Sequence, residues 1–528
     1  SLSTAEVVAA NRERFVRDYV NFRASAASDQ SGPQAVLLDL ASNRWGAERL
    51  ARLLVAQGIE VSRIDGPISA CGTRFEAGAF EVSFNQPAGR LARTMLEDTT
   101  ELPRDFMEEQ ERRRSRGLGA ELYDVTAWSL PLMHNVDAVT CRRSPGLSSH
   151  PVAADDAIAS TGSNAGAAWG YAIAWDDAGQ ARLVAALAAA GVPARSSDLP
   201  FRIGDRTFPR GSVVVPRHGA PANLDSLIAR FADEIGARFV GLASSWVDEG
   251  PNPGSENFMP VRAPRIAMLW DSGTDSNSAG PTRYVLEQRY GMPVSVIRAA
   301  NLGRADLSHF DVVILPEQGG SGYSSVLGES GSAQLTRFVR AGGVLIGLGD
   351  ATRWMADPEV GLVPARRERA ADTARTGTNR DQAVVDAVIL ENVDELGAVE
   401  AEQGAMPDYS PGALLHVEAN SDAWMSAGYD RGAAVLVTGS DIYAPISLDE
   451  ADTAMRFSGP ETLMAGGYMW AEYATQLAYK PFLISNSMGS GQVIAFTQAP
   501  TTRAYLEGLD LLLLNAVLLG PAHSRGMH

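Results

Sequence analysis

The sequence predicts an α/β protein in which two small duplicated α/β units precede a doubly wound domain. Two observations carry this prediction. Between Arg265 and Met355, short runs of Val, Ile and Leu each end in Gly, Asp or Ser before a helical pattern begins. Buried parallel strands and their crossover helices have this pattern. Earlier in the chain, an order of strand, helix, strand, hairpin and helix occurs twice, which indicates an internal repeat.

Length and composition narrow the class of protein. A chain of 528 residues accommodates about three domains of roughly 150 residues each. Its 45% hydrophobic and 20% charged residues are typical of a folded globular protein. A net charge of −18 repels nucleic acid and anionic lipid, so we expect no nucleic-acid partner. The apolar runs are shorter than the roughly 18 residues that a membrane span requires, so we expect none.

Residues 1–32 have the pattern of one long amphipathic docking helix. Val8, Phe15, Tyr19 and Phe22 recur at helical spacing on one face. No neighbouring segment offers that face a partner. We therefore expect the helix to dock on another domain, upstream of Ser1 or on a separate chain.

The two repeat units are predicted at residues 33–150 and 151–257. In the first, strands at 35–40 and 59–64 enclose a helix at 46–57, and a hairpin at Phe75–Gly78 precedes a helix at 87–96. At one constant offset, helix-face, turn and helix-end residues match between the copies, among them Leu50 and Leu183, Leu54 and Leu187, Gly58 and Gly191, Phe75 and Phe208, and Gly78 and Gly211. Residues of these kinds serve folding, so the duplication predicts a scaffold or docking surface.

Cys71 and Cys141 are the only cysteines. As an isolated pair without C-x-x-C spacing they do not indicate a metal cluster. They fit two small buried hydrophobic residues or one disulfide, and the pairing requires geometry that the sequence does not contain.

The doubly wound domain is predicted at 258–528, with a polar insertion near 357–413 that is poor in aromatic residues. In such domains, ligands and catalytic groups lie at the carboxyl ends of the strands. The candidate ligand-binding residues stand in the three loops that follow those strands: Asp271, Asp275, Glu317, Gly319, Gly320 and Asp350.

Two of these loops resemble those of class I glutamine amidotransferase-like, flavodoxin-like domains. Residues 315–320 (LPEQGG) are similar to the family's Pro-Gly-Gly oxyanion loop, and residues 347–351 (GLGDA) are similar to its G-x-C-x-G nucleophile elbow. Gly349 stands where the family has its nucleophile, and glycine has no side chain with which to attack. We expect Gly349 in the strand-to-helix turn and Asp350 capping the helix at 351–355.

A second resemblance covers nearly the whole chain. RFEAGAFEVSFNQPAGRLARTMLE, YDVTAWSLPLMHNV and GSGQVIAFTQAPTTRAYLEGLDLLLLNAVLLGP are similar to the region that follows the catalytic domain in large bacterial secreted zinc carboxypeptidases of the carboxypeptidase A/T type. The resemblance implies a secreted or periplasmic metallopeptidase that uses zinc to trim C-terminal residues from peptides. Its catalytic domain would lie upstream of Ser1.

A zinc site of that family requires His-x-x-Glu and a distant His. None of the seven histidines stands in such a motif, so we expect no catalytic residue, metal or cofactor in this chain. The favoured hypothesis is a non-catalytic accessory region whose partner is an upstream or separate peptidase domain. The alternative is a stand-alone hydrolase, or a module that binds a peptide or small molecule in the crevice of the last domain. Glu317 and Asp350 discriminate between these hypotheses, because a catalyst needs the two side chains to converge in a closed pocket with perturbed pKa values.

Overall fold

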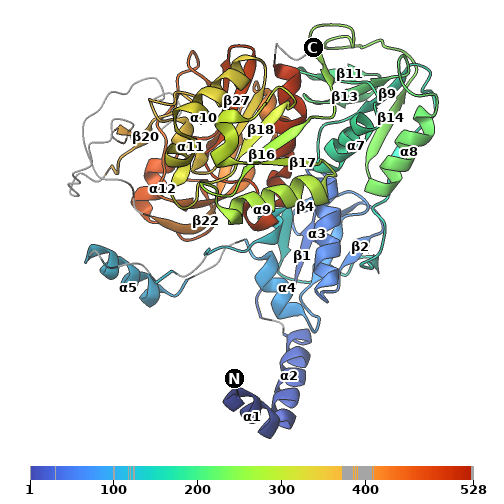
Figure 1. The fold of residues 1–528 in the computed structure, drawn as a ribbon. Coiled ribbons are helices and arrows are strands. Elements are labelled where there is room, and N and C mark those ends of the chain that lie inside the picture. The colour runs from blue at the N-terminus through green and yellow to red at the C-terminus, as the bar shows by residue number, and fades with distance from the viewer. Residues whose placement is uncertain are drawn as a thin grey trace. The chain divides into compact units, whose positions relative to one another are not determined.

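The computed structural model describes residues 2–29, 31–98, 102–116, 118, 121–122, 125–371, 384–385, 387, 389, 407 and 409–524. The chain divides into two compact units. The first unit contains residues 1–98 and 128–157, and the second contains residues 99–127 and 158–528 (Figure 1). The finer boundaries expected from the sequence, at 1–32, 33–150, 151–257 and 258–528, stay a prediction.

The N-terminal segment forms two helices, α1 (Leu2–Ala10) and α2 (Arg12–Ala27), where one was expected. Asn11 separates them, and its Nδ2 donates to the carbonyl of Val7 at 2.9 Å. An asparagine side chain competes in this way with regular helical hydrogen bonding. On the predicted apolar face, Phe15 is 39%, Tyr19 60% and Phe22 54% exposed. A partner for this face stays a prediction.

The first unit is built on an antiparallel sheet with strand order β6-β1-β5-β2-β7. Helices α3 and α4 pack their apolar side chains, such as Leu50 and Leu54, against Phe80 and Val82 of this sheet. The elements are β1 (Ala35–Leu38), α3 (Arg44–Ala56), β2 (Ser62–Ile64), β3 (Ile68–Ala70), β4 (Thr73–Phe75), β5 (Phe80–Ser83), α4 (Gly89–Leu96), α6 (Leu130–Met133), β6 (Ala138–Cys141) and β7 (Ser149–Pro151).

The second unit begins with a sheet of similar plan, in the order β15-β10-β13-β9-β14-β8. Here β14, β9, β13, β10 and β15 pair in the same sequence and with the same antiparallel sense as β6, β1, β5, β2 and β7. Descent of the two sheets from one duplicated unit stays a proposal. The elements are β8 (Thr161–Ser163), β9 (Gly170–Ile173), α7 (Ala178–Ala189), β10 (Ala194–Ser197), β11 (Phe201–Ile203), β12 (Arg206–Phe208), β13 (Val213–Pro216), α8 (Leu224–Ile235), β14 (Arg238–Leu242) and β15 (Phe258–Val261); α5 (Arg104–Ser115) also belongs to this unit.

The hairpin expected at Phe75–Gly78 is wrong in position. Strands β3 and β4 form the hairpin, and β5, which follows Gly78, pairs with β1 and β2 instead. The turn residues Cys71 and Gly72 both have positive φ, at 54° and 85°. A type I′ hairpin turn requires two positive φ angles, and a non-glycine residue supplies one of them here.

A disulfide joins Cys71 to Cys141, with the two Cα atoms 5.4 Å apart. It connects the β3–β4 turn to the end of β6 across a sequence separation of 70 residues. Both cysteines belong to the first unit.

Removing this disulfide should lower the free energy of unfolding of the first unit by about 2–4 kcal/mol, because a closed loop restricts the unfolded chain. Urea unfolding of the oxidised protein, the reduced protein and a Cys71→Ser/Cys141→Ser variant measures the effect. We expect reductant to shift the oxidised protein to the stability of the variant and to leave the variant unchanged. Equal stability of all three would contradict the prediction.

The remainder of the second unit is organised on a ten-stranded sheet within the described residues. Its parallel half has the order β17-β16-β18-β19-β27, which is the 2-1-3-4-5 order of flavodoxin-like domains and confirms that part of the predicted fold. Helices α10 and α11 cover one face (Figure 1). The elements of this half are β16 (Ile266–Trp270), α9 (Ser276–Tyr284), β17 (Val294–Arg298), β18 (Val312–Leu315), α10 (Gly322–Arg340), β19 (Val344–Leu348), α11 (Ala351–Met355) and β27 (Gly491–Phe496).

The antiparallel half continues from β27 through β26, β24, β22 and β23, and β25 also pairs with β22. The insertion expected near 357–413 lies mainly outside the described residues. No helix among the described residues is both long and apolar enough to cross a membrane. The remaining elements are β20 (Arg367–Glu368), β21 (Val384–Val385), β22 (Ser410–Ala419), β23 (Ala433–Gly439), β24 (Asp452–Phe457), β25 (Met464–Gly467), α12 (Ala471–Leu477), β26 (Pro481–Met488) and α13 (Asp510–Leu514).

Lys480 is the only lysine of the sequence, and it is fully buried. Its Nζ lies 2.6 Å from Oε1 of Glu368, which is also fully buried. Gln476 donates to the other carboxylate oxygen of Glu368 at 3.0 Å. Burial lowers the pKa of Lys480, and the neighbouring Glu368 carboxylate opposes that shift.

Candidate functional site

The predicted site loops follow β16, β18 and β19, which are neighbouring parallel strands. Parallel strands present their carboxyl ends at one edge of the sheet, so the loops meet there. The amide of Asp275 donates to the carbonyl of Glu317 at 2.8 Å, which joins the first loop to the second. The amide of Gln318 donates to Oδ1 of Asp350 at 2.6 Å, which joins the second loop to the third.

Gly349 lies in the turn between β19 and α11 with a φ of +54°. A Cβ atom at this position would lie 2.3 Å from Oε1 of Glu317. That separation is far shorter than any van der Waals contact, so the Glu317 carboxyl group occupies the space that a side chain at residue 349 would need. The elbow therefore contains a carboxyl group from the neighbouring loop where a nucleophile would project.

Three backbone amides of the LPEQGG loop have acceptors within the protein. Glu317 N donates to Oγ of Ser278 at 3.0 Å, and Gln318 N donates to Asp350. Gly319 N donates to the carbonyl of Gly273 at 3.1 Å. An oxyanion hole needs amide donors aimed at the oxygen of a substrate. These three amides are engaged elsewhere.

Burial raises the pKa of Glu317 to about 8, and the nearby carboxylates of Asp350 and Asp275 add to the shift. Burial also raises the pKa of Asp350, although the hydrogen bond from the amide of Gln318 acts to lower it. Within the part of the chain that the structure describes, the Glu317 carboxyl group makes no hydrogen bond. At neutral pH this group is therefore predominantly protonated and can donate a hydrogen bond to a ligand.

Asp350 does not cap α11, and the sequence prediction for its side chain is wrong. Its carboxylate instead accepts the amide of Gln318, and its carbonyl accepts Nε2 of Gln318 at 2.7 Å. Oε1 of the same glutamine accepts the amide of Tyr323 at 3.0 Å. A tertiary hydrogen bond has thus replaced the local one, and Gln318 holds the second and third loops together.

The structure brings Glu317, Asp350, Asp275 and Gly319 together. Asp275 caps α9 by accepting the amide of Asn277 at 2.9 Å. A Cβ on Gly319 would lie 2.7 Å from the carbonyl of Thr274, so this close approach of two loops requires glycine.

Asp271 and Gly320 are not part of that group. Asp271 has a φ of 75° and lies exposed at the end of β16, 3.6 Å from Nε of Arg298. Gly320 is exposed, with a φ of +60°. Backbone strain at Asp271 is a cost that functional loops often retain.

Sequence reasoning did not single out Ser278, Gln318 or Tyr323, which support the loops. Gln318 stands inside the loop that the sequence identified, and Ser278 follows the capping Asp275 in the first turn of α9. Tyr323 donates its hydroxyl to the carbonyl of Pro316 at 2.7 Å. Of these three residues, only Ser278 could have been predicted from local sequence, because it follows a helix-capping residue.

A hydroxyl group at this edge has a backbone partner. The hydroxyl of Thr352 donates to the carbonyl of Phe496 at 2.9 Å. His309 precedes β18, at the other end of that strand, and lies 3.5 Å from Asp306. Across the described ranges, no three His, Cys, Asp or Glu side chains are grouped so that they could hold a metal ion.

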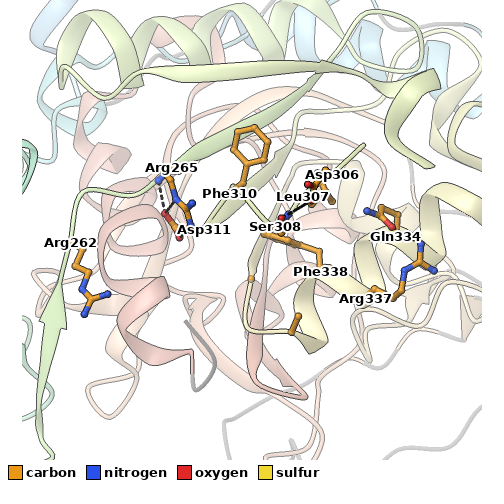
Figure 2. Close-up of a pocket in the computed structure, with 12 residues that line it drawn as sticks. Arg262, Arg265, Asp306, Leu307, Ser308, Phe310, Asp311, Gln334, Arg337 and Phe338 are labelled. Atoms are coloured by element: carbon orange, nitrogen blue, oxygen red, sulfur yellow. Dashed lines mark hydrogen bonds and ion pairs between the residues drawn. The ribbon is translucent and has the colours of Figure 1, made fainter. Parts of the chain in front are cut away.

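A cavity of about 600 Å³ lies at the opposite edge of the parallel sheet (Figure 2). Its lining includes Arg265 and Asp311, which precede β16 and β18 and form an ion pair at 2.8 Å. The hydroxyl of Ser308 donates a hydrogen bond to Oδ1 of Asp306 at 2.7 Å. Arg265 and Asp311 are thus paired with each other, and none of the candidate residues from the sequence lines this cavity.

No family model and no curated protein matches the chain. Among solved structures, a ThuA-like protein from Parabacteroides merdae is 11% identical with a TM-score of 0.33, over 51% of this chain and 93% of its own. A glutamine amidotransferase from Thermotoga maritima is 9% identical with a TM-score of 0.27, over 46% of this chain and 77% of its own. A β-galactosidase from Bacillus circulans is 16% identical with a TM-score of 0.25, over 48% of this chain and 30% of its own. These likenesses concern the type of fold and say nothing of an activity.

Proposed function

We propose that this chain is a non-catalytic accessory region of a zinc carboxypeptidase-like protein. Its glutamine amidotransferase-like domain would keep the fold of that family without its chemistry. The observation that carries the proposal is the position of Glu317, whose carboxyl group fills the space beside Gly349. With no side chain at residue 349 and the amides of Glu317, Gln318 and Gly319 engaged, acyl transfer lacks an attacking group in the elbow and these three oxyanion donors.

The link to a peptidase rests on the sequence resemblance. Its most specific phrase is YDVTAWSLPL, of which Tyr123 and Asp124 lie outside the described residues. The disulfide between Cys71 and Cys141 is compatible with a secreted or periplasmic protein, since disulfides persist in oxidising compartments. The exposed apolar face of α2 would then dock on the peptidase domain.

The purified chain should bind no stoichiometric zinc and release no C-terminal residue from peptides, because none of its histidines stands in the required ligand motif. Metal analysis after dialysis against micromolar zinc, together with mass spectrometry of incubated peptides, tests this expectation. A zinc carboxypeptidase assayed in parallel serves as the positive control. One tightly held zinc per chain, accompanied by trimming, would sink the proposal.

A second candidate is a binding module for a peptide or small molecule at the same edge. The specific observation in its favour is the raised pKa of Glu317, which leaves a neutral carboxyl donor without a protein partner among the described residues. Perturbed carboxyl groups of this kind are common in binding and catalytic sites. Binding without turnover would be compatible with both candidates, whereas turnover would exclude the first.

A further inference from the structure

A cavity of about 790 Å³ lies in the antiparallel half of the large sheet. Its lining comes from the ends of β22 and β24, the segment from Pro445 to Asp449, and the segment from Tyr479 to Pro481. A volume of this size accommodates a ligand as large as a short peptide.

The charged groups of the cavity are incompletely paired. Arg456 and Glu418 are directly opposite each other on β24 and β22. Nε of Arg456 is buried and makes no hydrogen bond, since the nearest ion-pair distance, to Oε2 of Glu418, is 3.8 Å. Asp449 adds a second carboxylate to the lining. The lining thus contains a guanidinium that is 36% exposed and has a long ion pair with Glu418, together with carboxylate acceptors, and a ligand that carries both charges could pair with these groups.

The rest of the lining is apolar and in part unusually exposed. Leu448 is 81% exposed, and Ile446 and Pro445 are half-buried beside it. Tyr479 holds a φ of 64°, and its hydroxyl oxygen would lie 2.5 Å from a Cβ on Gly459, so the ring packs directly against that glycine. A preformed wall reduces the entropy that binding would cost.

We propose that this cavity binds a zwitterion with an apolar side chain, either a short peptide with free ends or a free amino acid. The guanidinium of Arg456 would pair with the ligand carboxylate. Glu418 and Asp449 would accept hydrogen bonds from its ammonium group. Leu448, Ile446 and Tyr479 would cover its apolar side chain. Neutral or singly charged ligands leave one set of these groups unpaired, which disfavours them.

Calorimetric titration of the full chain with the tripeptide leucyl-alanyl-leucine, and separately with leucine, tests the proposal. We expect Arg456→Gln to weaken binding at least about tenfold, because a charge-assisted pair is lost. Leu448→Ser should also weaken binding, and its exposed position makes loss of the fold an inadequate explanation. Arg230→Gln, an arginine 58% exposed on α8, is the matched control and should change nothing.

Acetylating the amino end or amidating the carboxyl end of the tripeptide should each weaken binding to the wild-type chain. Preference for the tripeptide over leucine identifies peptides as the source, and equal binding identifies free amino acids. The proposal is overturned if neither probe binds, if both capped peptides bind as tightly as the free one, or if Arg456→Gln binds like the wild type.

Discussion

Replacing Glu317 by glutamine is expected to raise the free energy of unfolding of the second unit at pH 9 by up to about 5 kcal/mol. The carboxyl pKa is raised from 4.5 to about 8 in the folded protein. Between these values the folded state holds a proton that the unfolded state has released, so stability falls as pH rises through this window. Each unit of pKa shift corresponds to about 1.4 kcal/mol, and partial exposure makes the figure an upper bound. Glutamine carries no charge, so the variant does not lose this stability as the pH rises.

Chemical unfolding at intervals between pH 5 and pH 9 measures the difference between Glu317→Gln and the wild type. The two proteins should be similar near pH 5 and diverge as pH rises. Glu329→Gln, which replaces an exposed glutamate of α10, is the control and should follow the wild type throughout. A Glu317→Gln variant with an unchanged pH slope would contradict the assignment of a buried, protonated carboxyl group.

Replacing Lys480 by methionine is expected to lower the stability of the second unit by about 3–5 kcal/mol. The change removes the ammonium group that lies 2.6 Å from the fully buried Glu368 carboxylate. Methionine has a similar length, so loss of packing contributes little. Urea unfolding followed by tryptophan fluorescence provides the measurement.

A second substitution separates loss of the ion pair from a general loss of packing. Adding Glu368→Gln to Lys480→Met should recover most of the stability, because the neutral amide can still accept from Gln476. In the wild-type chain, Lys480 should react with an amine-directed reagent only under unfolding conditions. Full stability of the single variant, or no recovery in the double variant, would show that the pair is not a buried ion pair.

The parallel half-sheet was predictable because its strands are short runs of Val, Ile and Leu that are buried on both faces. The hairpin at Phe75–Gly78 was misplaced because strand pairing is non-local: β5 pairs with β1 and β2 instead of with β4, which precedes it in the chain. The disulfide between Cys71 and Cys141 likewise depends on a fold that brings distant residues together. The break at Asn11 arises from one side-chain hydrogen bond to Val7, which the periodicity of the apolar residues does not detect.

At the candidate site, the loops were predictable and their internal contacts were not. The rule that ligands meet the carboxyl ends of parallel strands identified Glu317 and Asp350. Local capping preference predicted the wrong partner for Asp350, because the amide of Gln318 approaches from another loop. No sequence pattern indicated that the Glu317 side chain would fill the space beside Gly349. That placement depends on the separation of β18 and β19 and on the rotamer of one residue.

The most direct test of the central claim is hydrolytic turnover by the purified chain at pH 8, with glutamine, activated esters and peptides as substrates. The structure contains a carboxyl group beside the elbow glycine, and we expect rates indistinguishable from those in buffer for both the wild type and Glu317→Gln. Turnover by the wild type that disappears in Glu317→Gln would contradict the account, because it would make Glu317 an acid or base in a working active site.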